Sequence, residues 1–317
     1  MTTYKETNGT NIEILSEDPA NPVQGQIWYN TDSSTLKGLG YVATGAWATG
    51  GNLNTARAAT GGAGTQTAGL AFGGGYPAKA NTESYNGSSW TELNDLNTVR
   101  AELAGTGTQT AALAFGGYPT LSLTETWNGT NWTEVNNLNT GRDNVGSATA
   151  GTNTATLAFG GLSLTANTEL WNGTNWTEVN NLNTATRGIA GAGTSTSALS
   201  SGGANPGITA NTETWNGTNW TEVNNLNTAR RNPGGAGINN TSAIAYGGYS
   251  TAYIAITEEW NGTNWTEIAD LSTARSAASS IGSSAAALAG GGYNGSYLAT
   301  TEEWTGVGPA VQTFSDA

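Results

Sequence analysis

The sequence contains neither cysteine nor histidine. The chain therefore cannot form a disulfide, a Ser-His-Asp or Cys-His nucleophile, or a zinc site with histidine ligands. Charged residues make up only 10% of the chain, well below the roughly 25% of an ordinary soluble domain. These absences restrict the function to classes that need neither imidazole nor thiol chemistry.

Basic residues are scarce as well. Only 10 lysines and arginines stand against 23 acidic residues, which gives a net charge of −13. A surface that follows the phosphates of DNA or RNA needs a basic patch, so we expect no nucleic-acid partner. No apolar run approaches ~18 residues, so we expect no membrane insertion. The N-terminal stretch MTTYKETNGTN has no apolar signal core, and we expect the protein to be made in the cytoplasm without export by the usual route.

Glycine and tryptophan are abundant, with 46 and 12 copies, and they recur in a repeat of 42–45 residues. Three markers define it: a Gly-Gly doublet after a small apolar stretch, a Glu-x-aromatic triplet, and a tryptophan followed ten or eleven residues later by an arginine. Each marker occurs six times. The six arginines are Arg57, Arg100, Arg142, Arg187, Arg230 and Arg275.

Each repeat predicts four short strands. In the third repeat, a Gly/Ala/Ser-rich stretch and an apolar stretch precede two strands that form a hairpin across Asn172-Gly173. The Asn-Gly step tolerates the positive φ that a tight turn needs. The loop NGTN places Trp171 and Trp176 opposite each other on one face, where such a pair stabilises the hairpin by roughly 0.5–1.5 kcal/mol beyond burial.

The order of the markers predicts how the array closes. A four-stranded sheet of this size cannot bury its own faces, and six copies can stack and close on themselves. The first tryptophan–arginine pair, Trp47 and Arg57, precedes the first Gly-Gly marker, Gly73-Gly74, and no such pair follows the last Glu-x-Trp, which ends at Trp304. We therefore predict that the strand near Trp47 pairs with the strand at Trp304.

The succession of Gly-Gly, Glu-x-aromatic, Trp and Arg resembles the Kelch motif over about residues 45–305. The units here are shorter than the typical ~50 residues, with short loops and Asn/Thr-rich turns. The resemblance implies an all-β fold over residues 43–317. This would be a six-bladed Kelch-like β-propeller with blades of four antiparallel strands, closed by an N-terminal strand in the last blade. It implies no particular activity, because one fold hosts many functions.

The repeated arginines and tryptophans have a functional and a structural interpretation. The arginines could form a ligand-binding ring, but we interpret all six as anchors between blades that meet the glutamate two positions before the aromatic residue. The tryptophans could stack on sugars, but their fixed positions favour a core between blades. The segment WNGTNWTEVNNLNTAR at 215–230 recurs almost unchanged at 127–142, and at 171–187 with what we interpret as one inserted residue.

The stretches between Gly-Gly and Glu-x-aromatic vary, while the rest of the repeat is nearly fixed. We expect these loops to share one rim with the crossings between blades, and tyrosine gives them rigid amphipathic contact surfaces. We predict ligand contacts there, with unconstrained variation as an equally open alternative. The tyrosines concerned are Tyr76, Tyr118, Tyr249, Tyr253, Tyr293 and Tyr297.

Groups for acid–base chemistry are few. Paired carboxylates could still catalyse a reaction, yet nearly every glutamate belongs to the repeat and the six aspartates show no calcium-loop spacing. Neither the copper-radical oxidase chemistry of some Kelch-like propellers nor the aspartate box of sialidase-type propellers fits this sequence. We therefore predict a protein that is not an enzyme, without catalytic, cofactor-binding or metal-binding residues.

Residues 1–42 lie outside the repeat and form an N-terminal arm. We predict a small hairpin with strands at 26–30 and 35–37, joined by a turn over residues 31–34. The apolar residues Ile27, Trp28, Tyr29 and Leu36 are too few for an independent core, so we expect them to dock on a partner surface. An inert extension that caps the propeller is the alternative.

The arm carries a second resemblance. Its pattern Asp-Pro-x-x-Pro…Gly-Gln-Ile-Trp-Tyr-Asn…Leu-Lys is similar, over about 25 residues, to the N-termini of structural proteins of tailed bacteriophages, marine and cyanobacterial phages in particular. The resemblance implies a multi-copy virion protein, such as a fibre, a neck or tail appendage or a capsid decoration. Its arm would bind other virion proteins, and its tyrosine loops would contact host-surface glycan. A bacterial Kelch-like carbohydrate- or protein-binding module outside a virion is the alternative.

Overall fold

The computed structural model is all-β and describes residues 12–19, 26–41, 45–162, 164–306 and 309–314. The chain forms two compact units, residues 46–305 on the one hand and residues 1–45 with 306–317 on the other. The described residues contain seven four-stranded sheets, six in the larger unit and one in the smaller. They include no helix long and apolar enough to span a membrane.

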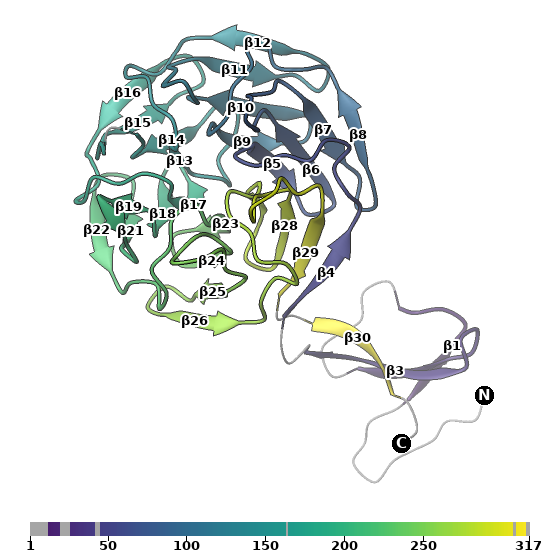
Figure 1. Ribbon diagram of the computed structural model, residues 1–317. Helices are drawn as coiled ribbons and strands as arrows, with labels where there is room; N and C mark the ends of the chain where they lie inside the picture. The colour runs from purple at the N-terminus through teal and green to yellow at the C-terminus, as the bar shows by residue number, and fades with distance from the viewer. Residues whose placement is uncertain (1–11, 20–25, 42–44, 163, 307–308, 315–317) are drawn as a thin grey trace. The chain divides into compact units, whose positions relative to one another are not determined.

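The six sheets of the larger unit are open antiparallel sheets in a propeller-like arrangement, with their first strands gathered at the centre (Figure 1). The first sheet consists of β5 (Gly61–Thr65), β6 (Ala68–Phe72), β7 (Thr82–Tyr85) and β8 (Trp90–Leu93). The second consists of β9 (Ala104–Thr108), β10 (Ala111–Phe115), β11 (Thr124–Trp127) and β12 (Trp132–Val135). The third consists of β13 (Gly146–Ser147), β14 (Thr156–Phe159), β15 (Thr168–Trp171) and β16 (Trp176–Val179). The fourth and fifth sheets are β17 (Ala190–Thr194), β18 (Ser197–Ser201), β21 (Thr212–Trp215) and β22 (Trp220–Val223); β23 (Gly234–Asn239), β24 (Ser242–Tyr246), β25 (Thr257–Trp260) and β26 (Trp265–Ile268). A short ribbon, β19 (Ala204–Asn205) and β20 (Gly207–Ile208), follows β18.

The sixth sheet joins the two ends of the larger unit. It consists of β27 (Ile281–Gly282), β28 (Ala286–Gly290), β29 (Thr301–Thr305) and, as its outer strand, β4 (Ala46–Gly50). β4 and β29 are antiparallel and Trp47 lies opposite Trp304. The predicted pairing between these two tryptophans is thereby confirmed.

The outer hairpins follow from the Asn-Gly turns. In the second sheet, Trp127 lies opposite Trp132 with ring centroids 5.3 Å apart. Between them the Asn128 side chain accepts hydrogen bonds from the backbone N–H groups of Thr130 and Asn131, both at 2.9 Å, and Gly129 has a φ of +91°. The predicted turn and cross-strand tryptophan pair are therefore correct, and the same pairing occurs at Trp171 and Trp176.

The first strands are rich in glycine because neighbouring sheets approach there backbone to backbone. A Cβ atom placed on Gly191 of β17 would lie 2.0 Å from the carbonyl oxygen of Ser147 in β13. No side chain fits at that distance, so small residues at the centre are a condition of stacking the sheets this closely.

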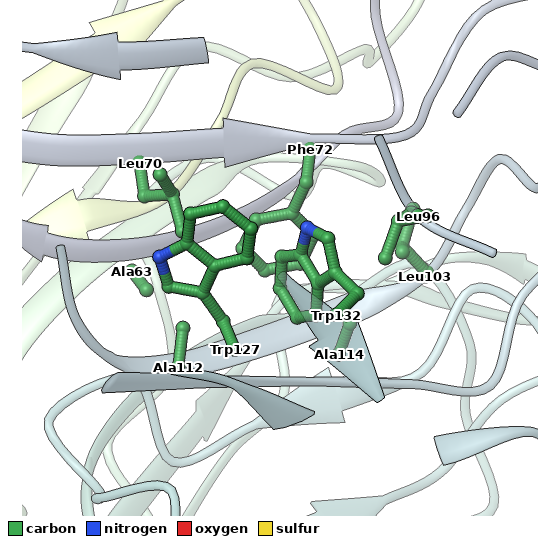
Figure 2. Packing of buried hydrophobic residues seen from close by; sticks show 9 residues of the cluster. All are labelled: Ala63, Leu70, Phe72, Leu96, Leu103, Ala112, Ala114, Trp127 and Trp132. Carbon is green, nitrogen blue, oxygen red and sulfur yellow. The ribbon is translucent and has the colours of Figure 1, made fainter. Parts of the chain in front are cut away.

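Tryptophan side chains fill the space between neighbouring sheets. Trp132 packs edge-on against Phe72 of the preceding sheet at 4.8 Å and donates its indole N–H to the Thr82 hydroxyl at 2.9 Å (Figure 2). This confirms the core interpretation of the tryptophans. Equivalent bonds link every neighbouring pair of the six sheets, the sixth and first included. They are Trp176–Thr124, Trp220–Thr168, Trp265–Thr212, Trp47–Thr257 and Trp90–Thr301.

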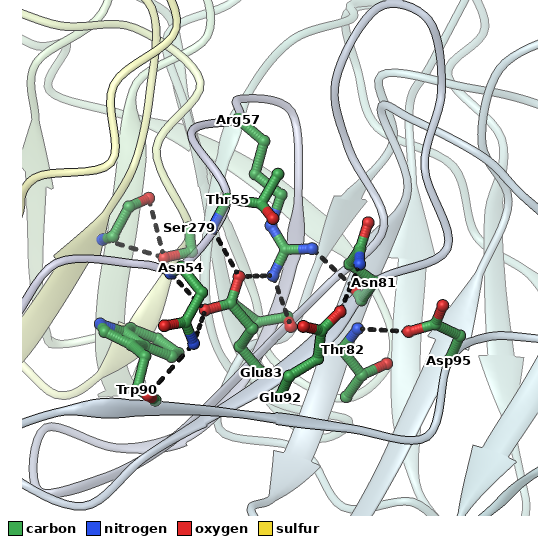
Figure 3. Close-up of polar contacts among 12 residues, drawn as sticks. Asn54, Thr55, Arg57, Asn81, Thr82, Glu83, Trp90, Glu92, Asp95 and Ser279 are labelled. Carbon is green, nitrogen blue, oxygen red and sulfur yellow. Dashed lines mark hydrogen bonds and ion pairs between the residues drawn. The ribbon is translucent and has the colours of Figure 1, made fainter.

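A buried arginine–glutamate pair forms the polar link between a crossing segment and the sheet that follows it. Figure 3 shows Arg57 beside Glu83, with a nitrogen–oxygen distance of 3.1 Å. Glu83 also accepts hydrogen bonds from the backbone and the side chain of Asn54. The same ion pair occurs at Arg100–Glu125, Arg142–Glu169, Arg230–Glu258 and Arg275–Glu302. The predicted anchor role is confirmed for these five arginines.

The prediction is wrong for Arg187. The segment at 171–187 contains no insertion: Thr186 aligns with Arg142 and Arg230, and Arg187 aligns with the residue that follows each of them. Thr186 is buried, whereas Arg187 is partly exposed and forms no ion pair with any described residue. The segment that enters the fourth sheet therefore has threonine at the position that is arginine in the other five.

The smaller unit is a four-stranded sheet in the order β1 (Glu13–Leu15), β2 (Ile27–Asn30), β3 (Thr35–Tyr41) and β30 (Pro309–Phe314). The predicted hairpin is confirmed as β2 and β3. The expected boundary differs, because β30 pairs along β3 and residues 306–317 belong with the arm and not with residues 46–305. The open edge of β3 offers unpaired backbone groups that a strand from the other end of the chain satisfies.

Replacing one buried arginine tests the anchor role. We expect Arg142→Met to lower the free energy of unfolding by about 3–5 kcal/mol, because it leaves Glu169 buried without its cation. The matched control is Arg187→Met, which removes an arginine without an ion pair and should change the free energy by less than about 0.5 kcal/mol. Urea unfolding followed by tryptophan fluorescence measures both. Equal losses in the two variants would contradict the assignment.

Candidate ligand-binding site

A pocket of about 430 Å³ opens at the centre of the larger unit. It is lined by the crossing segments that enter each sheet and by the loops that follow the Gly-Gly doublets. The two kinds of segment therefore share one rim, as the sequence predicted. We call this the central pocket.

A ring of six backbone hydrogen bonds surrounds the central pocket. Each crossing contributes one residue with a φ between 51° and 61°, whose N–H donates to the carbonyl of its counterpart in the neighbouring crossing at 2.7–3.0 Å. The series returns to its starting residue. Its members are Ala59, Glu102, Asn144, Gly188, Asn232 and Ala277. Because the ring uses backbone groups only, its side chains are free to differ, and three of them are polar.

Six tyrosines form a continuous chain of contacts at the mouth of the central pocket. Ring centroids lie 5.2 Å apart for Tyr249 and Tyr253, and 5.6 Å apart for Tyr253 and Tyr293. They lie 5.3 Å apart for Tyr293 and Tyr297, and the Tyr297 hydroxyl donates to the backbone carbonyl of Tyr76 at 3.2 Å. Tyr76 in turn lies 5.7 Å from Tyr118. We call this series the tyrosine arc.

Backbone pairing holds the tyrosines in place. Tyr249 and Tyr293 form β-bridges to Arg231 and Ser276 of the crossings beneath them. The six predicted contact residues are thus brought together, and all except Tyr118 line the central pocket. Their contact with a ligand stays a prediction.

Two charged residues of the central pocket were missed by the sequence prediction. Burial raises the pKa of Glu102 above its usual value, with a nearby Asp143 adding to the shift and hydrogen bonds from Tyr76 and Asn144 opposing it. Burial and the neighbouring Glu102 likewise raise the pKa of Tyr76. The Arg231 guanidinium lies over the Tyr249 ring, 5.0 Å from its centroid. The sequence did contain a signal for Glu102, because the equivalent positions of the other repeats hold alanine, asparagine or glycine.

The lining of the central pocket combines apolar and polar groups. Aromatic faces lie beside amide groups, a carboxyl group whose pKa is raised by burial, and one guanidinium, so the pocket offers apolar contact together with hydrogen-bond donors and acceptors. Among the described residues, no group of three or more acidic side chains could hold a metal ion.

The predicted docking residues of the arm belong to the smaller unit and do not line the central pocket. Trp28 is fully buried and donates its indole N–H to Asp18 at 3.1 Å, while Tyr29 is 37% exposed. Asp18 also accepts hydrogen bonds from Asn30 and Lys37, and the bond from Lys37 contributes most to lowering its pKa to about 2. Ile27 and Leu36 are partly buried. Of the four predicted docking residues, Trp28 therefore supports the arm sheet from within, and Tyr29 presents the most surface.

No protein-family model matches the chain, and no curated protein matches its sequence. Among solved structures, the chain is similar to the one described as "Structure of YjhT", with a TM-score of 0.65 and 14% sequence identity. The match covers 80% of this chain and 95% of that chain. At this level of identity the likeness shows a shared fold alone.

The raised pKa of Glu102 predicts a pH-dependent effect on stability. A carboxyl group with a higher pKa in the folded state stabilises the fold below its unfolded pKa, and this contribution is lost as the pH rises through the folded pKa. Relative to the unsubstituted protein, Glu102→Gln should therefore raise the melting temperature more at pH 8 than at pH 4. Thermal unfolding measures the difference. The exposed Glu134→Gln is the control, and an equal response of both variants would contradict the interpretation.

Proposed function

We propose that this chain is a non-enzymatic carbohydrate-binding module that recognises a glycan at the central pocket. The observation that carries the proposal is the tyrosine arc, a series of six tyrosines in successive contact, five of which line the central pocket. Sugar rings present apolar C–H faces that pack on aromatic side chains, and hydroxyl groups that need hydrogen-bond partners. Glu102, Asn144 and Asn232 line the same pocket and offer such partners.

The rigidity of the site supports recognition. Tyr118, Tyr249 and Tyr293 are paired to the crossings through backbone bridges, and the crossings are joined by the ring of backbone hydrogen bonds. A preformed surface loses little conformational entropy when a ligand binds. This argues for a binding surface and against loops that vary because nothing constrains them.

The proposed fold behind this site is a closed six-bladed Kelch-like β-propeller. Three observations support it: the six four-stranded sheets of residues 46–305, the tryptophan–threonine bonds that include the sixth and first sheets, and the ring of six backbone bonds. The seventh sheet belongs to the arm and is not a blade in this proposal.

The proposed biological setting is the virion of a tailed bacteriophage, where multiple copies of the protein attach to other virion proteins and the propeller contacts host-surface glycan. The arm favours this setting, because its sequence resembles phage structural proteins and it forms a compact unit separate from the propeller. A bacterial carbohydrate-binding module outside a virion uses the same central pocket and needs no particle partner.

Substitutions in the tyrosine arc test the binding site. We expect Tyr293→Ala to weaken binding of a glycan identified on an array by about 10- to 30-fold, because truncating a central aromatic contact typically costs about 2 kcal/mol. Tyr293→Phe keeps the ring and separates stacking from the hydroxyl group. Titration calorimetry with the purified glycan gives the affinities.

Tyr29→Ala serves as the control, since it removes an exposed tyrosine from the other unit. A loss of affinity in this control equal to that in Tyr293→Ala would rule out the central pocket. Failure of the unsubstituted protein to bind any surface polysaccharide of a susceptible host would rule out the glycan itself.

Removal of the arm tests the attachment role. Because the arm sheet includes β30, both residues 1–45 and residues 306–317 must be removed together. We expect residues 46–305 to retain the near-ultraviolet circular dichroism of the buried tryptophans and to fail to join particles. Normal incorporation of the shortened protein into purified particles would refute the attachment role.

A further inference from the structure

The fourth sheet departs from the other five at the position of the buried arginine. Five sheets receive an arginine from the preceding crossing, and each arginine pairs with the glutamate of its sheet. The fourth sheet receives Thr186 and buries Glu213, of which 3% is exposed. Breaking a buried ion pair by removing one partner is normally costly, so the Glu213 carboxylate needs another source of positive charge.

Arg142 shows what the guanidinium does in the other sheets. Its Nη2 donates to the Glu169 carboxylate at 2.7 Å, and its Nη1 donates to the backbone carbonyls of Gly160 at 3.3 Å and Asn167 at 2.6 Å. Three oxygen atoms therefore surround the end of one guanidinium group. The equivalent carbonyls of the fourth sheet belong to Gly202 and Asn211.

The backbone of the fourth sheet keeps this geometry. Glu213 accepts hydrogen bonds from the backbone N–H and the side-chain amide of Asn183 at 2.8 and 2.9 Å, as Glu169 does from Asn139. The Gly202 N–H donates to the Asn211 carbonyl at 2.9 Å, which matches Gly160 and Asn167 at 3.1 Å.

The oxygen atoms therefore remain in place without their cation. A threonine side chain ends at its γ atoms and carries no charge, and among the described residues no N–H or O–H group donates to the Gly202 carbonyl oxygen. The Glu213 carboxylate keeps its backbone donors but has no charged partner within ion-pair distance in the described part of the chain.

A second substitution accompanies the first. The residue opposite the glutamate on the neighbouring strand is alanine in five sheets, at Ala71, Ala114, Ala158, Ala245 and Ala289. In the fourth sheet it is Ser200, which lies opposite Glu213. Residues opposite each other in a ladder point to the same face, so the Ser200 hydroxyl lies on the face of the carboxylate. Only 4% of Ser200 is exposed.

Arg187 does not supply the missing charge. It forms no ion pair with Glu213, and its charge acts on Glu102 of the central pocket, where it opposes slightly the rise in pKa that burial causes. The sheet that lacks the arginine is also the sheet that has a serine, and not an alanine, opposite its glutamate. The Ser200 hydroxyl adds an oxygen atom that could bind a metal ion at the place where the other sheets have a guanidinium.

We propose that the fourth sheet binds a monovalent alkali cation, sodium or potassium, at the position that a guanidinium takes in the other five sheets. The ligands are the Glu213 carboxylate, the carbonyl oxygens of Gly202 and Asn211, and the Ser200 hydroxyl. An all-oxygen set suits a hard cation, and a single carboxylate is neutralised by one positive charge. The cation is structural and independent of the glycan proposed for the central pocket.

The test is the thermal stability of the full chain at constant ionic strength. Sodium or potassium chloride is raised from about 1 to about 100 mM against choline chloride, whose cation is too large for the site. Above the dissociation constant, we expect the melting temperature to rise by about 2–3 °C for each tenfold increase in alkali cation. An equal response to choline, or no response at all, overturns the proposal.

Matched variants locate the effect. The double variant Thr186→Arg with Ser200→Ala restores the residues of the other five sheets, so it should lose the alkali-cation response and melt higher than the unsubstituted protein in choline chloride. Glu213→Gln removes the carboxylate charge and should lose the response as well. An unchanged response in either variant places the cation elsewhere and overturns the proposal.

A direct measurement does not depend on whether the variants fold. Thallium(I) replaces alkali cations and scatters X-rays anomalously, so crystals of the unsubstituted protein soaked in a thallium(I) salt should show a peak in contact with Glu213 and Gly202. Density from an ordered water molecule, without an anomalous peak, refutes the cation.

Discussion

The buried glutamate of each sheet is the constraint on which the rest of the larger unit depends. A carboxylate removed from water needs strong donors, and here they come from the segment that arrives from the preceding sheet: a backbone N–H group, in most sheets an asparagine side chain, and in five sheets an arginine. Satisfying Glu169 therefore also fixes where the crossing at Asn139 must run. The tryptophan packing between sheets is compatible with that position, and both features repeat because the same sixteen residues repeat.

The central pocket is a consequence of this arrangement. Two residues beyond each anchoring position, the chain reaches the centre and joins the ring of backbone hydrogen bonds. The ring uses only backbone atoms, so Glu102, Asn144 and Asn232 can occupy positions that hold alanine or glycine elsewhere. The scaffold and the lining of the central pocket are therefore set by different atoms of the same segments, which allows the lining to change without loss of the fold.

The sequence alone was sufficient for features written in local repeats: the strand pattern, the Asn-Gly hairpins, the tryptophan core and the pairing of Trp47 with Trp304. It was insufficient where the decisive contact is between distant segments. A threonine stands directly before the repeated glutamate in every copy. Its role as hydrogen-bond acceptor for a tryptophan of the next sheet arises only when the sheets stack, so the repeat itself does not reveal it. The prediction for Arg187 was wrong because this arginine lies one residue beyond the anchoring position, which Thr186 occupies. The pairing of β30 with the arm had no local signal, and Glu102 was overlooked because it breaks the repeat.

The strand order also gives the two ends of the chain an arrangement with mechanical meaning. β3 pairs with β30, and the next strand, β4, pairs with β29, so two antiparallel ladders lie in series along the same pair of chain ends. A force that pulls the two termini apart acts first on the ladder of β3 and β30. It acts on the ladder of β4 and β29 only after the first ladder has separated. Unravelling from an end thus requires two successive ruptures, a kinetic barrier that equilibrium stability alone would not reveal.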